Sequence, residues 1–493
     1  MEKLEREYDK NHYFVDQSQA RGSWGTRFGF LIALWFASVG IGNVWRFPWK
    51  AASMGGGAFV VPYLIFVIIL SLPAVMGEGV TGKYGQGGPV QSYRKIGGPL
   101  RGLGISIIIL NAFVAYSIIV AGHALVFCIA SLTPMMNDPG AMWNSYISNP
   151  TLVTGVFILI VLLSVIPPYL GVNKGIEKFA IFMGVTCIAI LVIGAARAVT
   201  LPGAWAGIEY FLKPDWSKMF TINVLAGAMA QAYFSFGPGW AWFLTLSSYA
   251  KYNEDTGRAQ MTTGLADTSI ALLAGFCVLP VLFAMGLGTD LGTQSSFVAL
   301  PMLFGQMAGG RIFTFLFFLA FFFAAYTCEY VLVDVTGSFF QDAFQWPRKK
   351  SILAAGALLI AFGLWPTLNE TVFNTYDTLF GLYFLPMAVV LQALAAGWIF
   401  TAERFRKTVM NPWGNGYIGP IWDLFYRWVA PGLSLFLMIY WAIDMTRSGA
   451  PWYLGVGGMV IIAVVLLGSM YLFGQWDKAK EQRVLASFKS AGR

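Results

Sequence analysis

Four carboxylates stand inside long apolar runs of the sequence, where an ionisable side chain is unusual. They are Glu78, Asp267, Glu329 and Asp334. A charged side chain in a membrane-like environment is costly, so the ones that occur there usually bind an ion, relay a proton or pair with another group. Each of the four is therefore a candidate for a functional role, and Asp267 and Glu329 are the candidates for binding an ion or a proton. Asp267 is the most informative of them, and Glu329 is expected to face the interior of the helix bundle.

Two motifs interrupt other apolar runs with glycine and proline. They are FASVGIGNVWRFP (residues 36–48) and YFSFGPGWAW (residues 233–242). Glycine and proline weaken or break a helix, and free backbone groups at membrane depth are tolerated only where they line a cavity or meet a ligand. Half-helix ends offer amides to an anion and carbonyls to a cation. Close helix packing or a proline kink would explain one such motif, but two favour a transporter with a site at the midplane.

The sequence offers little to enzyme or metal chemistry. It has two histidines, His12 and His123, and four scattered cysteines without the spacing of a metal site. No nucleophile, base and orienting group can be assigned together, so we expect no enzyme activity. His123 is expected to be a packing residue. The net charge of +8 comes with basic loops, which favour anionic lipid over nucleic acid as the partner.

The composition explains where these residues must lie. Of the 493 residues, 57% are hydrophobic and only 11% are charged, against about 25% charged in a soluble protein. A membrane-spanning helix needs about 20 apolar residues, and the chain has about twelve such stretches. The predicted spans are residues 27–50, 57–80, 103–132, 151–171, 176–199, 220–249, 258–288, 312–343, 351–366, 373–402, 421–446 and 452–474.

Lysine and arginine predict the orientation of these spans. Basic residues concentrate before the first span and after the even-numbered spans, whereas the loop PMMNDPGAMWNSYISNP after the third has none. Because basic loops stay in the cytoplasm, both termini are expected there, in a multi-pass protein of the cell (plasma or inner) membrane. An even number of spans follows.

The segment RFGFLIALWFASVGIGNVWRFPWKAASMGGGAFVVPY (residues 27–63) resembles the first two spans of the neurotransmitter:sodium symporter family, almost position for position. The register continues through GKYGQGGPV, NKGIEKFA, Gln231, LPMLFGQMAGG and FFAAYTCEYVLVDV, so that the match covers the first ten spans. The resemblance implies an all-α polytopic membrane protein of the LeuT type. This fold has an inverted five-helix repeat in which helices one and six are broken.

The resemblance also implies the division of the chain and its activity. Residues 1–26 would be a cytoplasmic segment, 27–199 the first repeat, 220–402 the inverted second repeat, 421–474 helices eleven and twelve, and 475–493 a cytoplasmic tail. The activity would be sodium-driven uptake of an amino acid or amine by alternating access.

Matching positions imply the substrate class. Gly40 stands where amine transporters of the family carry aspartate and amino-acid transporters carry glycine, so a substrate with a carboxylate is expected. That carboxylate would meet the amides around Gly40 and Gly42 and the hydroxyl of Tyr116. A neutral, apolar amino acid is predicted. The remaining matching positions of the lid and the side-chain pocket are Phe234, Ala112, Gly237, Trp240, Cys328 and Leu332.

The resemblance implies one or two sodium sites. The first would use the Ser38 carbonyl together with Asn43, Ser235 and Asp267, where the family usually has asparagine instead of aspartate. A carboxylate at Asp267 would supply the charge that chloride supplies elsewhere, and the characteristic chloride-site serine is Ala271 here. Transport is therefore predicted to be independent of chloride, although Tyr63, Gln231 and Ser235 remain at other chloride-site positions.

The second site would use three backbone carbonyls, the hydroxyl of Thr327 and the side chain of Cys328. Because sodium prefers hard oxygen ligands, the thiol is expected to weaken this site. The carbonyls are those of Phe36, Val39 and Ala324.

Two further sets match the gates at the two mouths of the transport pathway. Arg46 and Asp377 would close the extracellular mouth. The cytoplasmic mouth would be closed by Arg21, Trp24, Tyr249 and Asp342.

Two alternatives stay open: a proton-coupled or sodium-independent amino-acid or amine carrier on the same fold, and a ligand sensor that does not transport. Glu78 is expected to hydrogen-bond the unwound part of span six.

Overall fold

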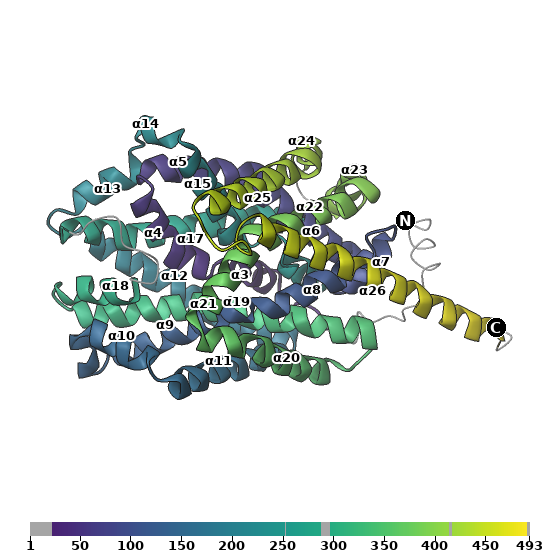
Figure 1. Cartoon of the computed structure of the whole chain (residues 1–493), viewed down its shortest axis with the longest axis horizontal. Coiled ribbons are helices and arrows are strands. Elements are labelled where there is room, and N and C mark those ends of the chain that lie inside the picture. The colour runs from purple at the N-terminus through teal and green to yellow at the C-terminus, as the bar shows by residue number, and fades with distance from the viewer. Residues whose placement is uncertain (1–21, 252, 287–295, 414–416, 491–493) are drawn as a thin grey trace.

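The protein is described by a computed structural model that covers residues 22–251, 253–286, 296–413 and 417–490 (Figure 1). Within these ranges the regular secondary structure is helical, and the only β-type pairing is an isolated bridge between Gly56 and Pro214. The all-α fold class predicted from the sequence is therefore confirmed.

Ten helical segments are long and apolar enough to cross a membrane. They are Gly57–Gly85 (α5, Gly57–Phe66, and α6, Leu72–Gly85), Leu103–Ala130 (α8, Leu103–Phe113, and α9, Ile118–Ala130), α11 (Pro150–Leu170), Val172–Val199 (containing α12, Lys178–Val199), α17 (Thr256–Ala284), α19 (Gly310–Phe344), α20 (Arg348–Leu368), Glu370–Ile399 (α21, Glu370–Leu379, and α22, Leu385–Gln392), Ile421–Arg447 (α24, Ile421–Leu424, and α25, Ala430–Arg447) and Val456–Lys480 of α26 (Val456–Ser490).

Two broken segments add to these ten spans, and the first of them raises the number of candidate spans among the described residues to eleven, against the twelve predicted. The pair α3 (Arg27–Ser38) and Gly42–Ser53, which contains α4 (Phe47–Ser53), is bent by 52° and passes the same test when taken together. The pair α15 (Ile222–Phe236) and α16 (Trp242–Ser248) is separated by residues 237–241. The two breaks fall in the two motifs that the sequence singled out.

Short helices outside the spans were not predicted, because they are too short or too polar to register as membrane segments. They are α7 (Pro89–Ile96), α10 (Pro139–Ile147), α13 (Ala204–Leu212), α14 (Trp216–Met219), α18 (Ser296–Gly305) and α23 (Ala402–Phe405). Helices α10, α13 and α18 gather at one end of the bundle, opposite the end towards which α26 runs (Figure 1). We call the end at which α26 finishes the terminal end.

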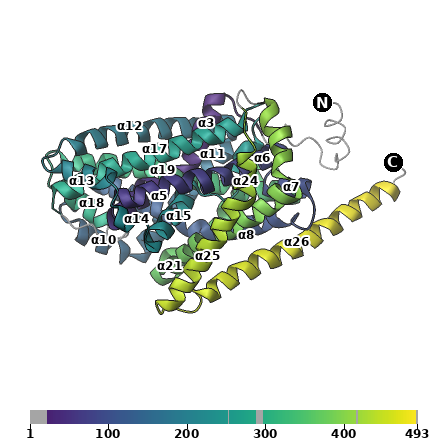
Figure 2. The same cartoon turned by 90° about the horizontal axis from the view of Figure 1, so that it is seen from above.

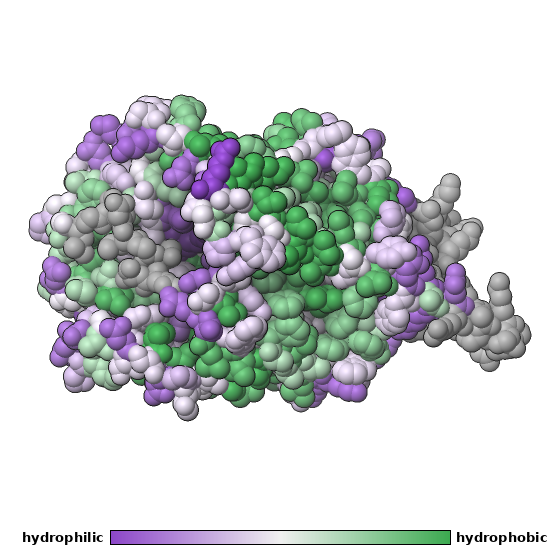
Figure 3. Space-filling view, viewed as in Figure 1, coloured by the Kyte–Doolittle hydropathy of each residue, from purple (hydrophilic) through white to green (hydrophobic). Residues whose placement is uncertain are grey.

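The spans form a buried centre and an apolar periphery. In Leu103–Ala130 and α19, 83% of the most apolar stretch is buried, against 17% in the span of α26, which lies along one side of the bundle (Figure 2). A broad hydrophobic band covers the middle of the surface between more polar ends (Figure 3). Exposed side chains such as Leu265 and Leu472 belong to the spans, as expected where lipid is the solvent.

The two breaks need glycine for different reasons, close packing at the first and backbone conformation at the second. A Cβ on Gly42 would lie 2.5 Å from the Phe234 carbonyl oxygen, so the first break could not pack against α15 with a larger residue. At the second break α15 ends on Gly237, whose φ of 62° is the left-handed conformation that favours glycine. The glycines thus let the two broken segments meet at the centre of the bundle.

Candidate functional site

A cavity of about 300 Å³ lies where the two breaks meet. The first break contributes the segment Ser38–Gly42 to its wall, apart from Val39, and the second contributes Gly237 and Trp240. Its other lining residues are Trp45, Arg46, Lys50, Tyr116, Ser117, Val120, Phe234, Ser235, Phe236, Trp242, Cys328, Glu329, Phe373, Asn374 and Asp377. Backbone from two interrupted helices therefore faces a space large enough for a small organic molecule, which is what the motifs predicted.

The residues of the first predicted cation site form one buried hydrogen-bonded cluster beside this cavity. The side-chain amide of Asn43 donates from Nδ2 to Ser235 Oγ at 2.8 Å and to the backbone carbonyl of Asp267 at 3.2 Å. Ser235 Oγ donates to Asp267 Oδ2 at 2.6 Å. Asp267 Oδ1 is buried and has no hydrogen-bond partner in the described structure. A carboxylate oxygen without a donor, among other side-chain oxygens, suits a hard cation such as Na⁺.

Two residues from the predicted chloride-site positions brace this cluster. The Tyr63 hydroxyl shares a hydrogen bond of 3.0 Å with Ser235 Oγ. Gln231 donates its amide to the carbonyl of Gly42 at 2.8 Å and so ties α15 to the first break. Ala271 is fully buried and contributes no polar atom from its side chain.

The residues of the second predicted cation site have a different chemistry. The Cys328 thiol lies 3.6 Å from the carbonyl oxygen of Ala37 and 3.8 Å from that of Val39, so its single S–H can donate to either. Thr327 donates its hydroxyl to the carbonyl of Ala324 in its own helix, at 2.7 Å. A Cβ on Gly40 would lie 2.4 Å from the Cys328 sulfur, so the thiol packs directly against the break. Phe36 is also fully buried.

Glu78 holds the second break open from the side of α6. Its Oε1 accepts the amide N–H of Gly239 at 2.6 Å and that of Ala241 at 3.4 Å. A buried carboxylate that accepts backbone donors satisfies groups which an intact helix would pair internally. Glu78 thereby stabilises the unwound conformation of residues 237–241.

The predicted pair for the extracellular mouth, Arg46 and Asp377, lines the cavity, but the two side chains do not pair directly in the described structure. The Arg46 guanidinium lies over the Phe234 ring, 3.7 Å from its centroid. Asp377 Oδ1 accepts a hydrogen bond of 3.0 Å from the Tyr116 hydroxyl. This mouth is therefore lined by separated charges rather than closed by an ion pair.

The terminal end of the same pathway is closed by a buried network. Trp24 donates its indole N–H to the carbonyl of Leu246 at 3.0 Å and packs edge-on against Tyr249. The Tyr249 hydroxyl donates to Asp334 at 2.9 Å, and Arg348 pairs with Asp334 at 2.5 Å. The network joins the start of the first broken segment, the end of the second, α19 and α20.

The other predicted gate residues lie near this network or outside the described residues. Asp342 accepts the backbone N–H of Gln91 at 3.2 Å. Arg21 lies outside the described residues. Among the predicted pocket residues, Ala112 and Leu332 are buried but do not line the cavity.

Sequence reasoning did not assign two residues that the structure places at these sites. Arg348 belongs to the run Arg348–Lys349–Lys350, which was interpreted only as a determinant of orientation. Ser117 lines the cavity and donates to Glu329. The available signal for Arg348 was its spacing from Asp334, because the two residues lie on either side of the turn between α19 and α20.

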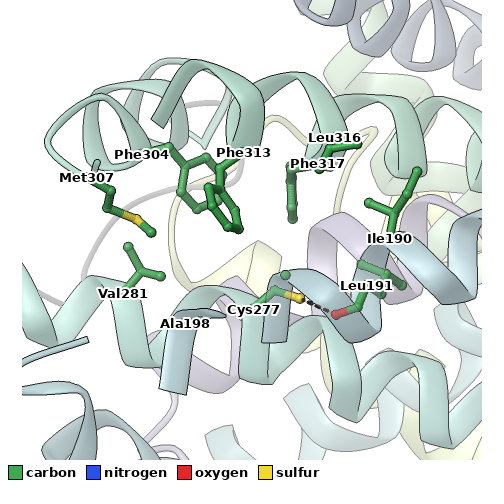
Figure 4. A pocket seen from close by; sticks show the side chains of 11 residues that line it. Ile190, Leu191, Ala198, Cys277, Val281, Phe304, Met307, Phe313, Leu316 and Phe317 are labelled. Atoms are coloured by element: carbon green, nitrogen blue, oxygen red, sulfur yellow. Dashed lines mark hydrogen bonds between the residues drawn. The ribbon is translucent and has the colours of Figure 1, made fainter. Parts of the chain in front are cut away.

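A much smaller cavity, of about 20 Å³, lies between α12, α17, α18 and α19 (Figure 4). Apolar side chains such as Phe304 and Phe317 line it, and its Cys277 thiol donates to the carbonyl of Leu191 at 3.2 Å. A space of this size and polarity holds no more than a water-sized void. It is a packing defect rather than a ligand site.

Two broken helices around a buried polar site, hollow at one end and closed at the other, define a secondary transporter. Comparison with known proteins identifies the family. The model of the sodium:neurotransmitter symporter family matches residues 21–149 and 144–476. The chain belongs to this family of sodium-dependent transporters, which are not enzymes.

Individual relatives are similar over nearly their whole lengths. An uncharacterised sodium-dependent transporter of Haemophilus influenzae is 27% identical over 86% of this chain and 98% of its own. The sodium-dependent serotonin transporter of Drosophila melanogaster is 26% identical over 96% of this chain and 86% of its own. The crystal structure of MhsT in complex with L-phenylalanine superposes with a TM-score of 0.77 at 27% identity, covering 85% of this chain and 99% of MhsT. The predicted LeuT-type fold is confirmed.

Proposed function

We propose that the protein couples the uptake of an amino acid to sodium, independently of chloride, by alternating access. The observation that carries this proposal is the buried cluster of Asn43, Ser235 and Asp267, in which Asp267 Oδ1 has no hydrogen-bond partner among the described residues. A cation bound there would touch the same break in the first helix that lines the cavity. Binding of the ion would therefore shape the wall against which the substrate rests.

The carboxylate of Asp267 also supports independence from chloride. A sodium ion beside an ionised aspartate is already neutralised, so no second anion is required at the cluster. The characteristic serine of a chloride site is replaced by Ala271, which is fully buried and apolar. Uptake should therefore be unchanged when gluconate replaces chloride, and a collapse of uptake would contradict this part of the proposal.

An amino acid is the favoured substrate because Gly40 leaves the first break without a side-chain carboxylate. Substrate carboxylate can then approach the backbone around Gly40 and Gly42, both of which line the cavity. MhsT was crystallised in complex with L-phenylalanine, which supports an amino acid here too. Gly237 and Trp240, which line the cavity, favour an apolar body for the substrate side chain.

The two mouths support alternation. The separated pair Arg46 and Asp377 at one end and the network of Tyr249, Asp334 and Arg348 at the other correspond to a state open on one side. With both termini in the cytoplasm of a cell-membrane protein, that open side would face outwards. The repeats 27–199 and 220–402 would then move relative to each other around the cavity.

Thermal-shift screening of the twenty standard amino acids, with sodium or with potassium, tests the proposal. A ligand that binds only the folded protein raises its melting temperature by mass action. We expect stabilisation by at least one amino acid in sodium and not in potassium. Stabilisation that follows pH instead of sodium would favour the proton-coupled alternative, and binding without uptake into proteoliposomes would favour the sensor.

A further inference from the structure

A carboxylate that the pocket positions did not include lies in the wall of the cavity. Glu329 of α19 is 2% exposed and lines the cavity. Among the described residues, only Ser117 donates to it, at 3.2 Å to Oε1 and 3.5 Å to Oε2. An ionised carboxylate offers about four acceptor positions, so a single hydroxyl leaves most of them for a ligand in the cavity.

Glu329 faces a different wall of the cavity from its neighbour. Cys328 points at the first break, where its sulfur contacts the backbone carbonyls of Ala37 and Val39. Glu329 points at Ser117, which belongs to the turn between α8 and α9. A substrate whose carboxylate rests at Gly40 can therefore extend from the break towards Glu329 with the rest of its length.

The other charged side chains at the cavity lie on helices other than that of Glu329. Four charged side chains line it: Arg46, Lys50, Asp377 and Glu329. Arg46 lies over Phe234 and Asp377 accepts from Tyr116, with Lys50 one turn beyond Arg46 along the chain, and none of these groups forms an ion pair with Glu329 in the described structure. A sodium ion would balance Asp267. Once the mouth closes, an ionised Glu329 would be a buried negative charge and would need a positive partner.

We propose that Glu329 binds a protonated nitrogen at the end of the substrate's side chain, so that the substrate is an amino acid with a cationic side chain and an apolar stem. This inference rests on the proposed function, because it takes the amino-acid head at the first break as given. It replaces the neutral side chain predicted from the sequence. The apolar residues of the cavity wall contact the apolar stem of the substrate, and Glu329 binds the protonated nitrogen at the end of that stem.

The test uses matched ligands on the purified full-length protein in sodium. Lysine is compared with norleucine, which has the same chain without the terminal ammonium, and both are compared with pentylamine, which lacks the carboxylate and the α-amino group of the amino-acid head. Binding is measured by thermal shift and by competition for uptake of radiolabelled lysine into proteoliposomes. The variant Glu329→Gln keeps the shape of the side chain and removes its charge, and Ser117→Ala removes only the neighbouring hydroxyl.

We expect lysine to bind more tightly than norleucine in the native protein, by roughly tenfold or more, as charge-assisted hydrogen bonds allow. Glu329→Gln should reverse this preference while norleucine binds as well as before or better, which a merely structural role of Glu329 would not produce. Ser117→Ala should keep the preference for lysine.

Other outcomes separate the two proposals. Norleucine binding as tightly as lysine in the native protein would overturn the inference about Glu329 and leave the proposed function intact. Pentylamine binding as tightly as lysine, with both lost in Glu329→Gln, would support Glu329 as the cation site but overturn the amino-acid head of the proposed function. Uptake of neutral amino acids with a proton flux that Glu329→Gln abolishes would overturn the inference in favour of a proton site.

Discussion

The two predicted cation sites lie against the same break in the first helix, one facing α15 and α17 and the other facing α19, yet their ligands differ. The first joins Asn43, Ser235 and Asp267 through hydrogen bonds of 2.6 to 3.2 Å between nitrogen and oxygen atoms. At the second, the Cys328 thiol occupies the space between the carbonyls of Ala37 and Val39.

The difference teaches how a break in a helix can be stabilised in two ways. Orphaned carbonyls need either a cation or a hydrogen-bond donor. The first site keeps a carboxylate oxygen without a donor and thus needs the cation, whereas at the second site the thiol supplies a donor to one of two carbonyls. We infer that coupling to sodium depends on the first site, and the following experiments test that asymmetry.

The largest effect is expected from Asp267→Ala. Removing one partner of a buried charge pair costs about 3–5 kcal/mol, which corresponds to a loss of sodium affinity on the order of a hundredfold or more. Uptake measured against sodium concentration should therefore collapse at ordinary sodium levels. Ser269→Ala on the exposed face of the same helix is the matched control, since that hydroxyl bonds only to its own helix. Native sodium affinity in Asp267→Ala would remove the first site from the account.

A chloride requirement should appear when the charge is removed and the chloride-site hydroxyl is restored. In Asp267→Asn combined with Ala271→Ser, we expect uptake to rise roughly tenfold when chloride replaces gluconate, because the anion then supplies the missing charge. The native protein should respond less than about twofold, within the range of a weak screening effect. Equal responses of the double variant and the native protein would contradict the role assigned to Asp267.

A smaller gain is expected from Cys328→Ser. A hydroxyl oxygen is a hard ligand for sodium, whereas a thiol is soft. The variant should therefore strengthen the second site, and the Hill coefficient for sodium should rise from about one towards two as a second ion participates. Measuring uptake over a range of sodium concentrations decides this. Unchanged sodium dependence would show that the thiol does not limit the second site.

The smallest effect is expected from Thr327→Ala in the native background. Its hydroxyl donates to a carbonyl of its own helix, and losing such a local bond changes stability by about 1 kcal/mol or less. Sodium dependence should stay within about threefold of native. In the Cys328→Ser background the same change should abolish the gain, because the rebuilt site needs both oxygens. A large loss in the native background would mean that the second site is already occupied.

The sequence predicted the spans and the two breaks well, because these depend on composition and local backbone preference. Long apolar runs specify membrane helices, and the glycines of the two motifs leave helical pairing incomplete wherever they occur. The fold class follows from the same features. The short helices α10, α13 and α18 were not predicted, because they are too short or too polar to register as membrane segments.

The network at the terminal end shows what sequence alone could not predict. Asp334 and Arg348 are separated by the end of α19, and only the turn into α20 brings their side chains to 2.5 Å. Glu329 was recognised as an interior acid, but its partner Ser117 lies on a distant part of the chain. Such pairs depend on tertiary packing. The family resemblance predicted neither the pairing of Asp334 with Arg348 nor that of Glu329 with Ser117.

The dependence of substrate accumulation on the sodium gradient tests the central claim most directly. In proteoliposomes at zero membrane potential, the logarithm of the substrate ratio at equilibrium is plotted against that of the sodium ratio. With coupling through the first site alone, we predict a slope of about one, and about two in Cys328→Ser, since each coupled ion adds one power of its gradient. A slope of about two in the native protein, or no dependence on sodium at all, would contradict the account.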